Sequence, residues 1–423
     1  MSDARGSKKT SLDESDGSTP IYGWLVVAAC FGLTLTLGET FWTFGIFFKP
    51  LQQEFGWSRA LVSSIFTAFL LGYAVSVIAS GRLVDRYNPK PVLLISALLI
   101  GSGLCLCSVA STITHFRFFL LIVGLGSGAT WSVPNSTVQR WFYKKRSAGL
   151  AIGVVVSGVG VGALVFAPLI NVLIMSYGWR NTFLIIGLLF SVVVVAATLV
   201  IRPSPPDTMT LLKNHQRASP PAGVTPPTTN QLLTTWAFAA TAFIVSAGVL
   251  IFQIVSAHLV PHATDAGISA SASALALGLM GGFSIPGRVL SGLFSARLGW
   301  HNLLALSFFG MGTTMVCLLM LKDLWMLYVF ALSYGMFHGI RIAGQVAVLP
   351  EIFGIRSLGE LIGISSAIGQ IVASFAPYAA GAIFDATGSY SPAFIVIIVL
   401  SLAAGLVAAL LKRIASRSAA IIP

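Results

Sequence analysis

The sequence predicts an all-α membrane protein with twelve transmembrane helices in two six-helix, pseudo-symmetric halves. Three observations support this fold class: 56% of the 423 residues are hydrophobic, only 9% are charged, and long apolar stretches recur along the whole chain. Soluble domains carry roughly 25% charged residues, so these few charges cannot cover a surface that faces water. Most of the surface is therefore expected to face the lipid bilayer.

The apolar stretches and the segments between them set the expected organisation of the chain. Residues 1–20 are polar and predict a disordered cytoplasmic tail rather than a signal peptide. The proline-rich residues 203–231 predict a cytoplasmic linker between an N-terminal half (21–202) and a C-terminal half (232–413), and residues 414–423 predict a second tail. Twelve stretches reach the spanning length of about 20 residues. They cover residues 22–48, 60–81, 91–111, 116–139, 148–175, 181–201, 234–260, 269–294, 301–321, 325–349, 358–383 and 391–411.

Basic residues predict the orientation. With the N-terminus in the cytoplasm, most of the 25 Lys and Arg residues fall in cytoplasmic segments, and few fall on the opposite side. This asymmetry is the positive-inside bias of membrane proteins. It explains the net charge of +12 without a nucleic-acid partner. We expect an integral plasma (inner) membrane protein with both termini in the cytoplasm.

The two halves repeat each other in sequence. Similar residues recur at a constant offset of 211 positions, namely Gly56 and Gly267, Gly81 and Gly292, Arg86 and Arg297, and Phe183 and Phe394. Six helices per half makes the repeats parallel, related by an axis along the membrane normal. A substrate of such a protein is expected between the halves, near the middle of the bilayer.

Two segments indicate how the protein could change conformation. The segment from Gly81 to Asp85 and Arg86 resembles the loop between the second and third helices of the major facilitator superfamily. That resemblance implies the major facilitator fold, with a Gly-x-x-x-Asp-Arg core that lets helices approach and locks one conformation. The second copy has Ala296 in place of the acid. We assign conformational gating to Gly81, Asp85 and Arg86, and to Asp265 in the other half.

A narrower resemblance covers nearly the whole chain. Tyr22-Gly23-Trp24, Phe47-Phe48-Lys49 and the run from Trp141 to Arg146 resemble segments of the monocarboxylate transporter family, and the bacterial oxalate–formate antiporters share the overall style. The resemblance implies a bacterial member that moves a small, lactate- or pyruvate-like carboxylate together with a proton by alternating access. The alternative is an exchanger of a dicarboxylate such as oxalate against a monocarboxylate.

Three charged residues lie deep within the predicted helices, away from their ends. Arg288, Arg341 and Glu39 each interrupt an apolar stretch, where an ionised side chain costs roughly 3 kcal/mol or more. Arg288 matches the arginine that binds the substrate carboxylate in the monocarboxylate transporter family, and a guanidinium offers a planar fork that suits a carboxylate. Arg341 is expected to be either a second anion anchor or a structural partner for a carboxylate or for backbone carbonyls.

The family's proton relay is not copied in this chain. Ser284 stands where mammalian members carry an aspartate, and Trp42 stands where they carry a lysine. The resemblance also places Trp131, Ser284, Tyr334 and His338 around the substrate.

The residues Tyr334, His338, Arg341 and Gln345 are spaced to share one face of a helix. His338 and Glu39 are the candidates for the coupled proton, because His titrates near physiological pH and burial favours a reversibly protonated carboxyl group. The alternative is that both only make structural hydrogen bonds. His258 and His262, at the outer end of the helix predicted over 234–260 and near Asp265, are expected to be solvated; the alternative is a role in gating or proton entry.

Several function classes find no support in the sequence. There is no Gly-x-x-x-x-Gly-Lys-[Ser/Thr] motif for ATP, no His-Glu-x-x-His motif and no cluster with metal-ligand spacing. We expect no enzyme activity, no cofactor and no metal. The expected partners are the carboxylate, protons and the lipid bilayer, and the protein is expected to be a monomer.

Overall fold

The computed structural model describes residues 21–86, 88–142, 147–202, 229–353 and 358–419. These residues are almost entirely helical, and none of them forms a β-strand. The helices of the first half are α1 (Ile21–Phe55), α2 (Arg59–Arg86), α3 (Pro89–Ser108), α4 (Ile113–Ser127), α5 (Ala129–Trp141) and α6 (Ala148–Val200). Those of the second half are α8 (Thr229–Leu233), α9 (Trp236–Asp265), α10 (Ala270–Leu298), α11 (Trp300–Leu319), α12 (Leu324–Phe353), α13 (Leu358–Ser374), α14 (Ala376–Thr387) and α15 (Ser391–Ala419).

The described residues form twelve membrane-length segments. Eleven continuous helical stretches are long and apolar enough to cross a bilayer. The pair α4 and α5 forms one of these stretches, and the pair α13 and α14 forms another. The twelfth segment arises because α6 is long enough to cross twice. The 53-residue α6 would be about 80 Å long as a straight helix, more than twice the thickness of the hydrocarbon core. Gly178 interrupts it with a φ of 77° and a ψ of 162°, a conformation that glycine adopts readily. The chain therefore turns at Gly178, and the predicted fold class is confirmed.

The observed boundaries differ from the predicted ones in a few places. The predicted helix over 358–383 is broken between Ser374 and Ala376, next to Pro377, because proline lacks the N–H that would continue the helix. Within the predicted linker, α8 begins at Thr229, and α15 continues past residue 413. The rest of the predicted linker, the N-terminal tail and residues 420–423 lie outside the described residues.

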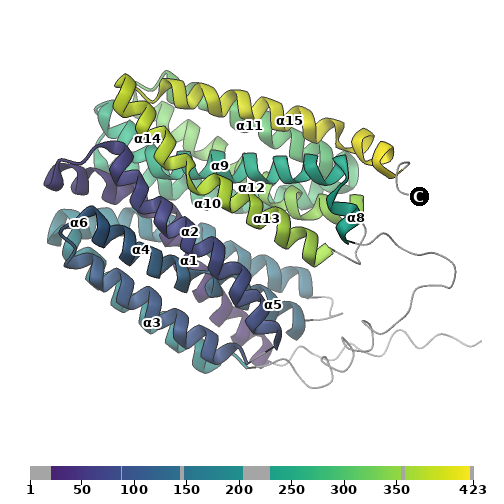
Figure 1. Cartoon of the computed structure of the whole chain (residues 1–423), viewed down its shortest axis with the longest axis horizontal. Helices are drawn as coiled ribbons and strands as arrows, with labels where there is room; N and C mark the ends of the chain where they lie inside the picture. The colour runs from purple at the N-terminus through teal and green to yellow at the C-terminus, as the bar shows by residue number, and fades with distance from the viewer. Residues whose placement is uncertain (1–20, 87, 143–146, 203–228, 354–357, 420–423) are drawn as a thin grey trace, which may run out of the picture.

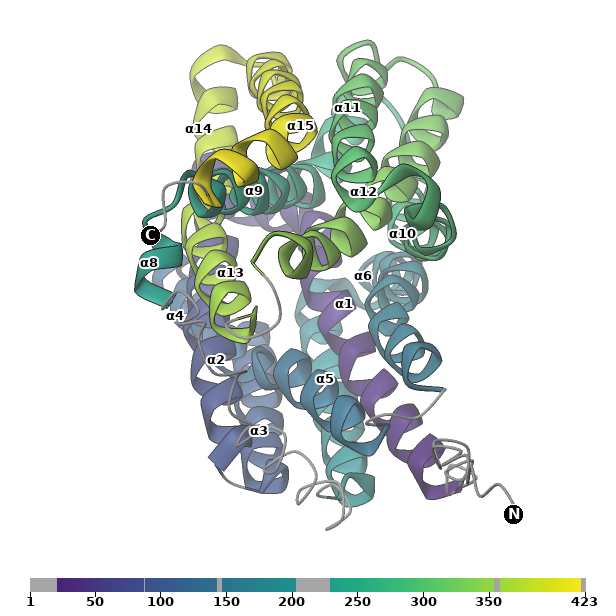
Figure 2. The same cartoon turned by 90° about the vertical axis from the view of Figure 1, so that its right-hand side faces the viewer.

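The helices pack as two bundles side by side. Helices α1 to α6 contact one another, α9 to α15 contact one another, and α1 with α9, α6 with α10, and α2 with α13 and α14 join the bundles. Most of the helices run along the long axis of the molecule (Figure 1). Figure 2 shows the two bundles from one end. We call the end where α1 begins and α15 ends the terminal end, and the end where α1 meets α2 the far end.

Small residues let the two halves approach each other closely. A Cβ atom added to Gly160 of α6 would lie 2.7 Å from the carbonyl oxygen of Gly281 on α10, closer than any side chain could fit. Lipid supplies no hydrophobic force between helices, so membrane bundles gain stability from such close backbone packing. Contacts of this kind fix how α10 stands beside the first half, and α10 and its neighbour α12 carry Arg288 and Arg341.

Candidate functional site

Close packing of α10 against α12 brings Arg288 and Arg341 together. A Cβ atom on Gly339 of α12 would lie 2.0 Å from the carbonyl oxygen of Ser284 on α10, so the two backbones touch at this level. Arg288 lies one turn beyond Ser284, and Arg341 lies two residues beyond Gly339. The two guanidiniums are consequently close enough to repel each other. Two like charges close to each other inside the bundle favour the approach of an anion.

Neither arginine has an acidic partner among the residues that the structure describes. The half-buried Arg288 donates from Nη1 to the carbonyl oxygen of Val156 on α6 at 2.9 Å, and its buried Nε has no partner. Arg341 is 4% exposed, donates from Nη1 to Oε1 of Gln345 at 2.7 Å, and likewise has an unpartnered Nε. Both acceptors are neutral, so they satisfy part of the hydrogen-bonding capacity of the two arginines but do not offset their positive charges.

His338 stands in an enclosure of aromatic rings. Its ring centroid lies 5.5 Å from Trp42 on α1, 4.7 Å from Phe252 on α9, and 6.1 Å from Tyr334, on which it stacks. His338 is buried, its Nδ1 has no hydrogen-bond partner among the described residues, and both Arg288 and Arg341 act on it electrostatically. The hydroxyl group of Tyr334 is also buried without a partner. These unpaired polar atoms lie next to the two unpaired cations.

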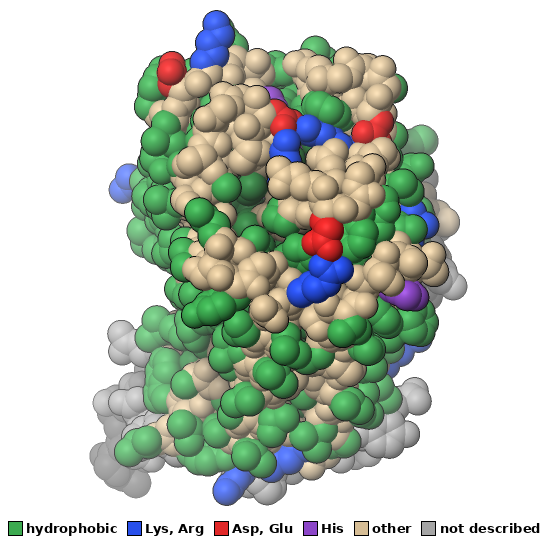
Figure 3. Space-filling model, turned by 90° about the vertical axis from the view of Figure 1, so that its left-hand side faces the viewer, with side chains coloured by type: hydrophobic (Ala, Val, Ile, Leu, Met, Phe, Trp, Pro, Cys, Tyr) green, Lys and Arg blue, Asp and Glu red, His purple; other side chains and the backbone are tan. Residues whose placement is uncertain are grey.

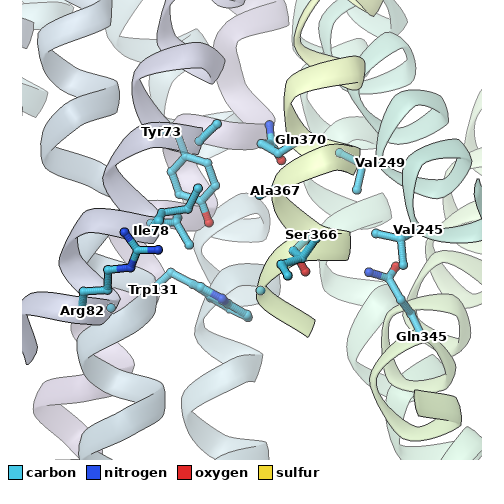
Figure 4. A pocket seen from close by; sticks show the side chains of 15 residues that line it. Tyr73, Ile78, Arg82, Trp131, Val245, Val249, Gln345, Ser366, Ala367 and Gln370 are labelled. Atoms are coloured by element: carbon cyan, nitrogen blue, oxygen red, sulfur yellow. The ribbon is translucent and has the colours of Figure 1, made fainter. Parts of the chain in front are cut away.

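A cavity of about 650 Å³ lies between the halves, lined by α2 and α5 on one side and by α9, α12 and α13 on the other. Figure 4 shows its lining from close by. The lining residues are Tyr73, Ala74, Val77, Ile78, Gly81, Arg82, Trp131, Val245, Val249, Gln345, Gly363, Ile364, Ser366, Ala367 and Gln370. No acidic side chain is among these described residues, and Arg82 is their one charged group. The cavity is thus suited to a neutral or anionic molecule.

The predicted binding residues divide into two groups. Trp131 lines the cavity, and Arg341 approaches it through its bonded neighbour Gln345. Arg288, Ser284, Tyr334 and His338 do not line it. The buried hydroxyl group of Ser284 donates to the carbonyl oxygen of Gly281 on its own helix at 2.6 Å.

Glu39 is held by its own helix. It is 4% exposed, and its carboxylate accepts hydrogen bonds from the hydroxyl groups of Thr40 at 3.0 Å and Thr43 at 2.8 Å. It does not line the cavity. Trp42, one turn along α1, is the residue of this region that contacts His338.

Ion pairs link the two halves at the far end. Asp265, the last residue of α9, pairs with Lys49 of α1 and with Arg59, the first residue of α2. The guanidinium of Arg59 also stands 3.5 Å from the centre of the Phe384 ring on α14. Figure 3, which faces this end, shows basic and acidic side chains lying against each other.

Asp385 of α14 adds a second link at the same place. Its two carboxylate oxygens accept the backbone N–H groups of Arg59 at 2.9 Å and of Ala60 at 2.8 Å. These N–H groups open α2 and have no partner within that helix, so a carboxylate from the other half caps it. Neither Arg59 nor Asp385 stood out in the sequence, because they are 326 positions apart.

The expectation that His258 and His262 are solvated is wrong. His258 is 0% exposed and hydrogen-bonds the hydroxyl group of Tyr390 at 3.0 Å and the carbonyl oxygen of Pro377 at 2.9 Å. His262 bonds the carbonyl oxygen of Leu318 at 2.8 Å. The α14–α15 region covers this end of α9, which a helix-by-helix reading of the sequence could not show.

Comparison with known proteins decides the family. The sequence model of the Major Facilitator Superfamily matches residues 25–322. The chain belongs to the Major Facilitator Superfamily. Human monocarboxylate transporter 12 is 25% identical over 425 residues, covering 93% of this chain and 80% of that protein, and rat monocarboxylate transporter 13 is 27% identical over 384 residues, covering 89% and 85%. The predicted resemblance to monocarboxylate transporters is confirmed.

A solved structure shows the same fold. The crystal structure of a bacterial homologue of the human lysosomal transporter Spinster, inward-facing and unoccupied, superposes with a TM-score of 0.72. It is 17% identical and covers 95% of this chain and 99% of its own. The superfamily and the relatives' names place this chain among membrane transporters rather than enzymes. A bacterial source and a kinship with oxalate–formate antiporters stay predictions.

The superfamily's loop motif borders the cavity. Gly81 lines the cavity close to the terminal end of α2, with Arg82 beside it. The side chains of Asp85 and Arg86 lie outside the described part of the structure. Their predicted gating role therefore stays a prediction.

Proposed function

We propose that this chain is a secondary transporter that moves a small, lactate- or pyruvate-like carboxylate with a proton by alternating access. One observation carries the proposal: Arg288 and Arg341 lie together inside the bundle without an acidic partner among the described residues. Placing a charge at this depth costs roughly 2.5–3.5 kcal/mol, which a purely structural residue would offset with a permanent counter-charge. A transported anion supplies that counter-charge only while it is bound.

The cavity and the far-end ion pairs support a route for the substrate. The cavity extends toward the terminal end, because it is lined by Gly81 and Arg82 on the last turns of α2 and by Gly363 near the start of α13. At the far end, Asp265 and Asp385 tie the halves together. With both termini in the cytoplasm of an inner (plasma) membrane, this conformation admits substrate from inside. Release of the Asp265 ion pairs and closure around Gly81, Asp85 and Arg86 would give the opposite state.

The proton is assigned to His338, with Glu39 as the second candidate. A carboxylate bound beside Arg288 and Arg341 offsets the positive charge that both arginines exert on His338. Anion binding and protonation of His338 then favour each other, which couples the two movements. Glu39 is buried but bonded by Thr40 and Thr43 on its own helix, so its link to the anion is less direct.

Uptake into liposomes with an imposed acid-outside gradient tests this function. The purified protein should accumulate labelled lactate or pyruvate in response to the gradient, and membrane potential should have no effect because one proton and one monoanion carry no net charge. His338→Phe should abolish uptake driven by the gradient while sparing exchange of labelled for unlabelled substrate, and Glu39→Gln is the matched second variant. Full gradient-driven uptake by both variants would exclude both residues as proton carriers.

A second candidate function is exchange of a dicarboxylate such as oxalate against a monocarboxylate. The pair of neighbouring guanidiniums favours it, because two carboxylates on one substrate could engage one guanidinium each. The same liposomes separate the two functions. An exchanger loaded with unlabelled formate takes up oxalate whatever the pH gradient, whereas a proton symporter follows the gradient.

A further inference from the structure

Gln345 occupies a distinctive position between the cavity and Arg341. It lines the cavity, and its Oε1 accepts a hydrogen bond of 2.7 Å from Nη1 of Arg341. The two residues are four positions apart on α12, so their side chains meet on one face of the helix. Figure 4 shows Gln345 on the side of the cavity opposite Tyr73 and Arg82. A molecule in the cavity therefore meets this amide group before it meets the arginine.

Arg341 is tightly packed against α9. A Cβ atom added to Gly248 of α9 would lie 2.5 Å from Nη1 and 2.8 Å from Cδ of Arg341. The guanidinium thus packs against the backbone of α9 at Gly248, whereas Gln345 borders the cavity, so an acceptor that enters from the cavity can reach Arg341 at the position where Gln345 bonds it. Nε of Arg341, buried and without a partner among the described residues, shows that the group has donor capacity left over.

An amide oxygen is a weak occupant for such a position. It accepts a hydrogen bond from Arg341 but brings no negative charge, whereas a carboxylate adds the attraction between opposite charges and can accept two parallel N–H bonds from one guanidinium. A neutral molecule gains nothing by replacing the amide, because it would exchange one neutral acceptor for another. An anion gains the attraction between its negative charge and the Arg341 guanidinium, which is strong in the low-dielectric interior of the bundle.

We propose that Gln345 acts as a resident stand-in for the substrate carboxylate, and that an incoming carboxylate displaces its amide oxygen from Arg341. This inference rests on the proposed function and names a residue that determines its specificity. Once displaced, the amide group of Gln345 can turn its NH₂ toward the ligand, since glutamine carries both donors and acceptors. The Gln345 amide, which keeps neutral molecules from Arg341 in the ligand-free protein, then donates a hydrogen bond to the bound anion.

Replacing the neutral stand-in by a charged one tests the proposal. In Gln345→Glu, a permanent carboxylate on Arg341 should raise the melting temperature of the ligand-free protein and weaken binding of lactate, pyruvate and oxalate at least about tenfold, as expected when a charge-assisted hydrogen bond is lost. Gln345→Met removes the stand-in and should lower the ligand-free melting temperature while anion-induced stabilisation persists. Both effects are measured by thermal unfolding of the purified full-length chain with each anion.

Gln370→Glu is the matched control, because it adds the same charge to the same cavity lining from α13. Its loss of affinity should be clearly smaller than that of Gln345→Glu. Equal losses of affinity in the two variants would show that an added charge repels anions anywhere in the cavity. A Gln345→Met variant that binds no anion would show that Gln345 itself is required to bind the anion. Either result overturns the displacement of Gln345 by the substrate. A wild type that responds to no carboxylate overturns the proposed function as well, whereas a wild type and a Gln345→Glu variant that respond equally overturn this inference alone.

Discussion

The far end and the middle of the molecule treat charged side chains in opposite ways. At the far end, Asp265 pairs with Lys49 and Arg59 across the two halves. In the middle, Arg288 and Arg341 have only neutral acceptors within the described part of the chain, namely the carbonyl oxygen of Val156 and the amide of Gln345. Under the proposed function, charges paired between the two halves hold one conformation closed, whereas cations without a counter-charge attract an anion. On that proposal, the far end holds a state and the middle of the molecule receives the ligand.

The largest expected effect is at Arg288. Arg288→Lys keeps the charge but removes the planar fork that can bind both oxygens of a carboxylate, so transport should fall to a few per cent or less. The chain should still fold, because a lysine can reach the neutral acceptor on α6. Uptake of labelled carboxylate by liposomes, normalised to protein that elutes as a single species, measures the effect. Normal uptake by a well-expressed variant would remove Arg288 as the anchor.

Arg341 should discriminate substrates by charge. A monocarboxylate that loses Arg341 can still pair with Arg288, whereas a dicarboxylate uses both guanidiniums at once, so Arg341→Gln should weaken transport of oxalate by roughly tenfold more than that of lactate. Competition between the two anions in one uptake assay gives the ratio directly. Equal losses for both, together with a lower melting temperature, would instead mark Arg341 as structural.

A smaller effect is expected at the far end, where we propose that the ion pairs set the balance between two states. Asp265→Asn removes both pairs of a partly exposed carboxylate, each worth at most about 1 kcal/mol, so the population open at the far end should rise several-fold. A cysteine in place of Ser63, a buried neighbour of His258, should then react faster with a water-soluble maleimide.

Glu54→Gln is the control for this change. It breaks the ion pair between Glu54 and Arg180, whose two residues belong to the same half, on α1 and α6. Labelling at position 63 should stay at the wild-type rate in this variant. Equal acceleration by both substitutions would mean that the far-end pairs only stabilise the fold, and that the contrast with the middle of the molecule is not about conformation.

The sequence predicted the helices better than the contacts between them. Apolar stretch lengths placed twelve spans, and the four-residue spacing of Arg341 and Gln345 placed them on one face, because both properties are local to one helix. The contact of Trp42 with His338 and the capping of Arg59 by Asp385 join residues hundreds of positions apart. Such contacts depend on how whole helices pack, which no spacing within one helix records.

The cavity lining shows the same limit. Trp131 was expected to face the substrate from its family position, whereas Tyr73 and Gln370 carry no signal beyond being polar or aromatic residues within apolar stretches. Interruptions of an apolar helix by Gln or Tyr are the feature that could have singled them out. Asp265 was expected to act in gating, and its ion pairs across the halves give that expectation a physical basis.

The most direct measurement compares an anion with a neutral molecule of the same size. Lactate, pyruvate and oxalate each have an amide counterpart, namely lactamide, pyruvamide and oxamide, which keeps the shape and removes the charge. At concentrations of about 100 times the dissociation constant, a ligand stabilises the native state by about 2.7 kcal/mol, a readily measured rise in melting temperature. If Arg288 and Arg341 form an anion site, at least one acid raises the melting temperature of the full-length protein and its amide does not. Equal stabilisation by an acid and its amide, or none by any acid, would contradict the anion site.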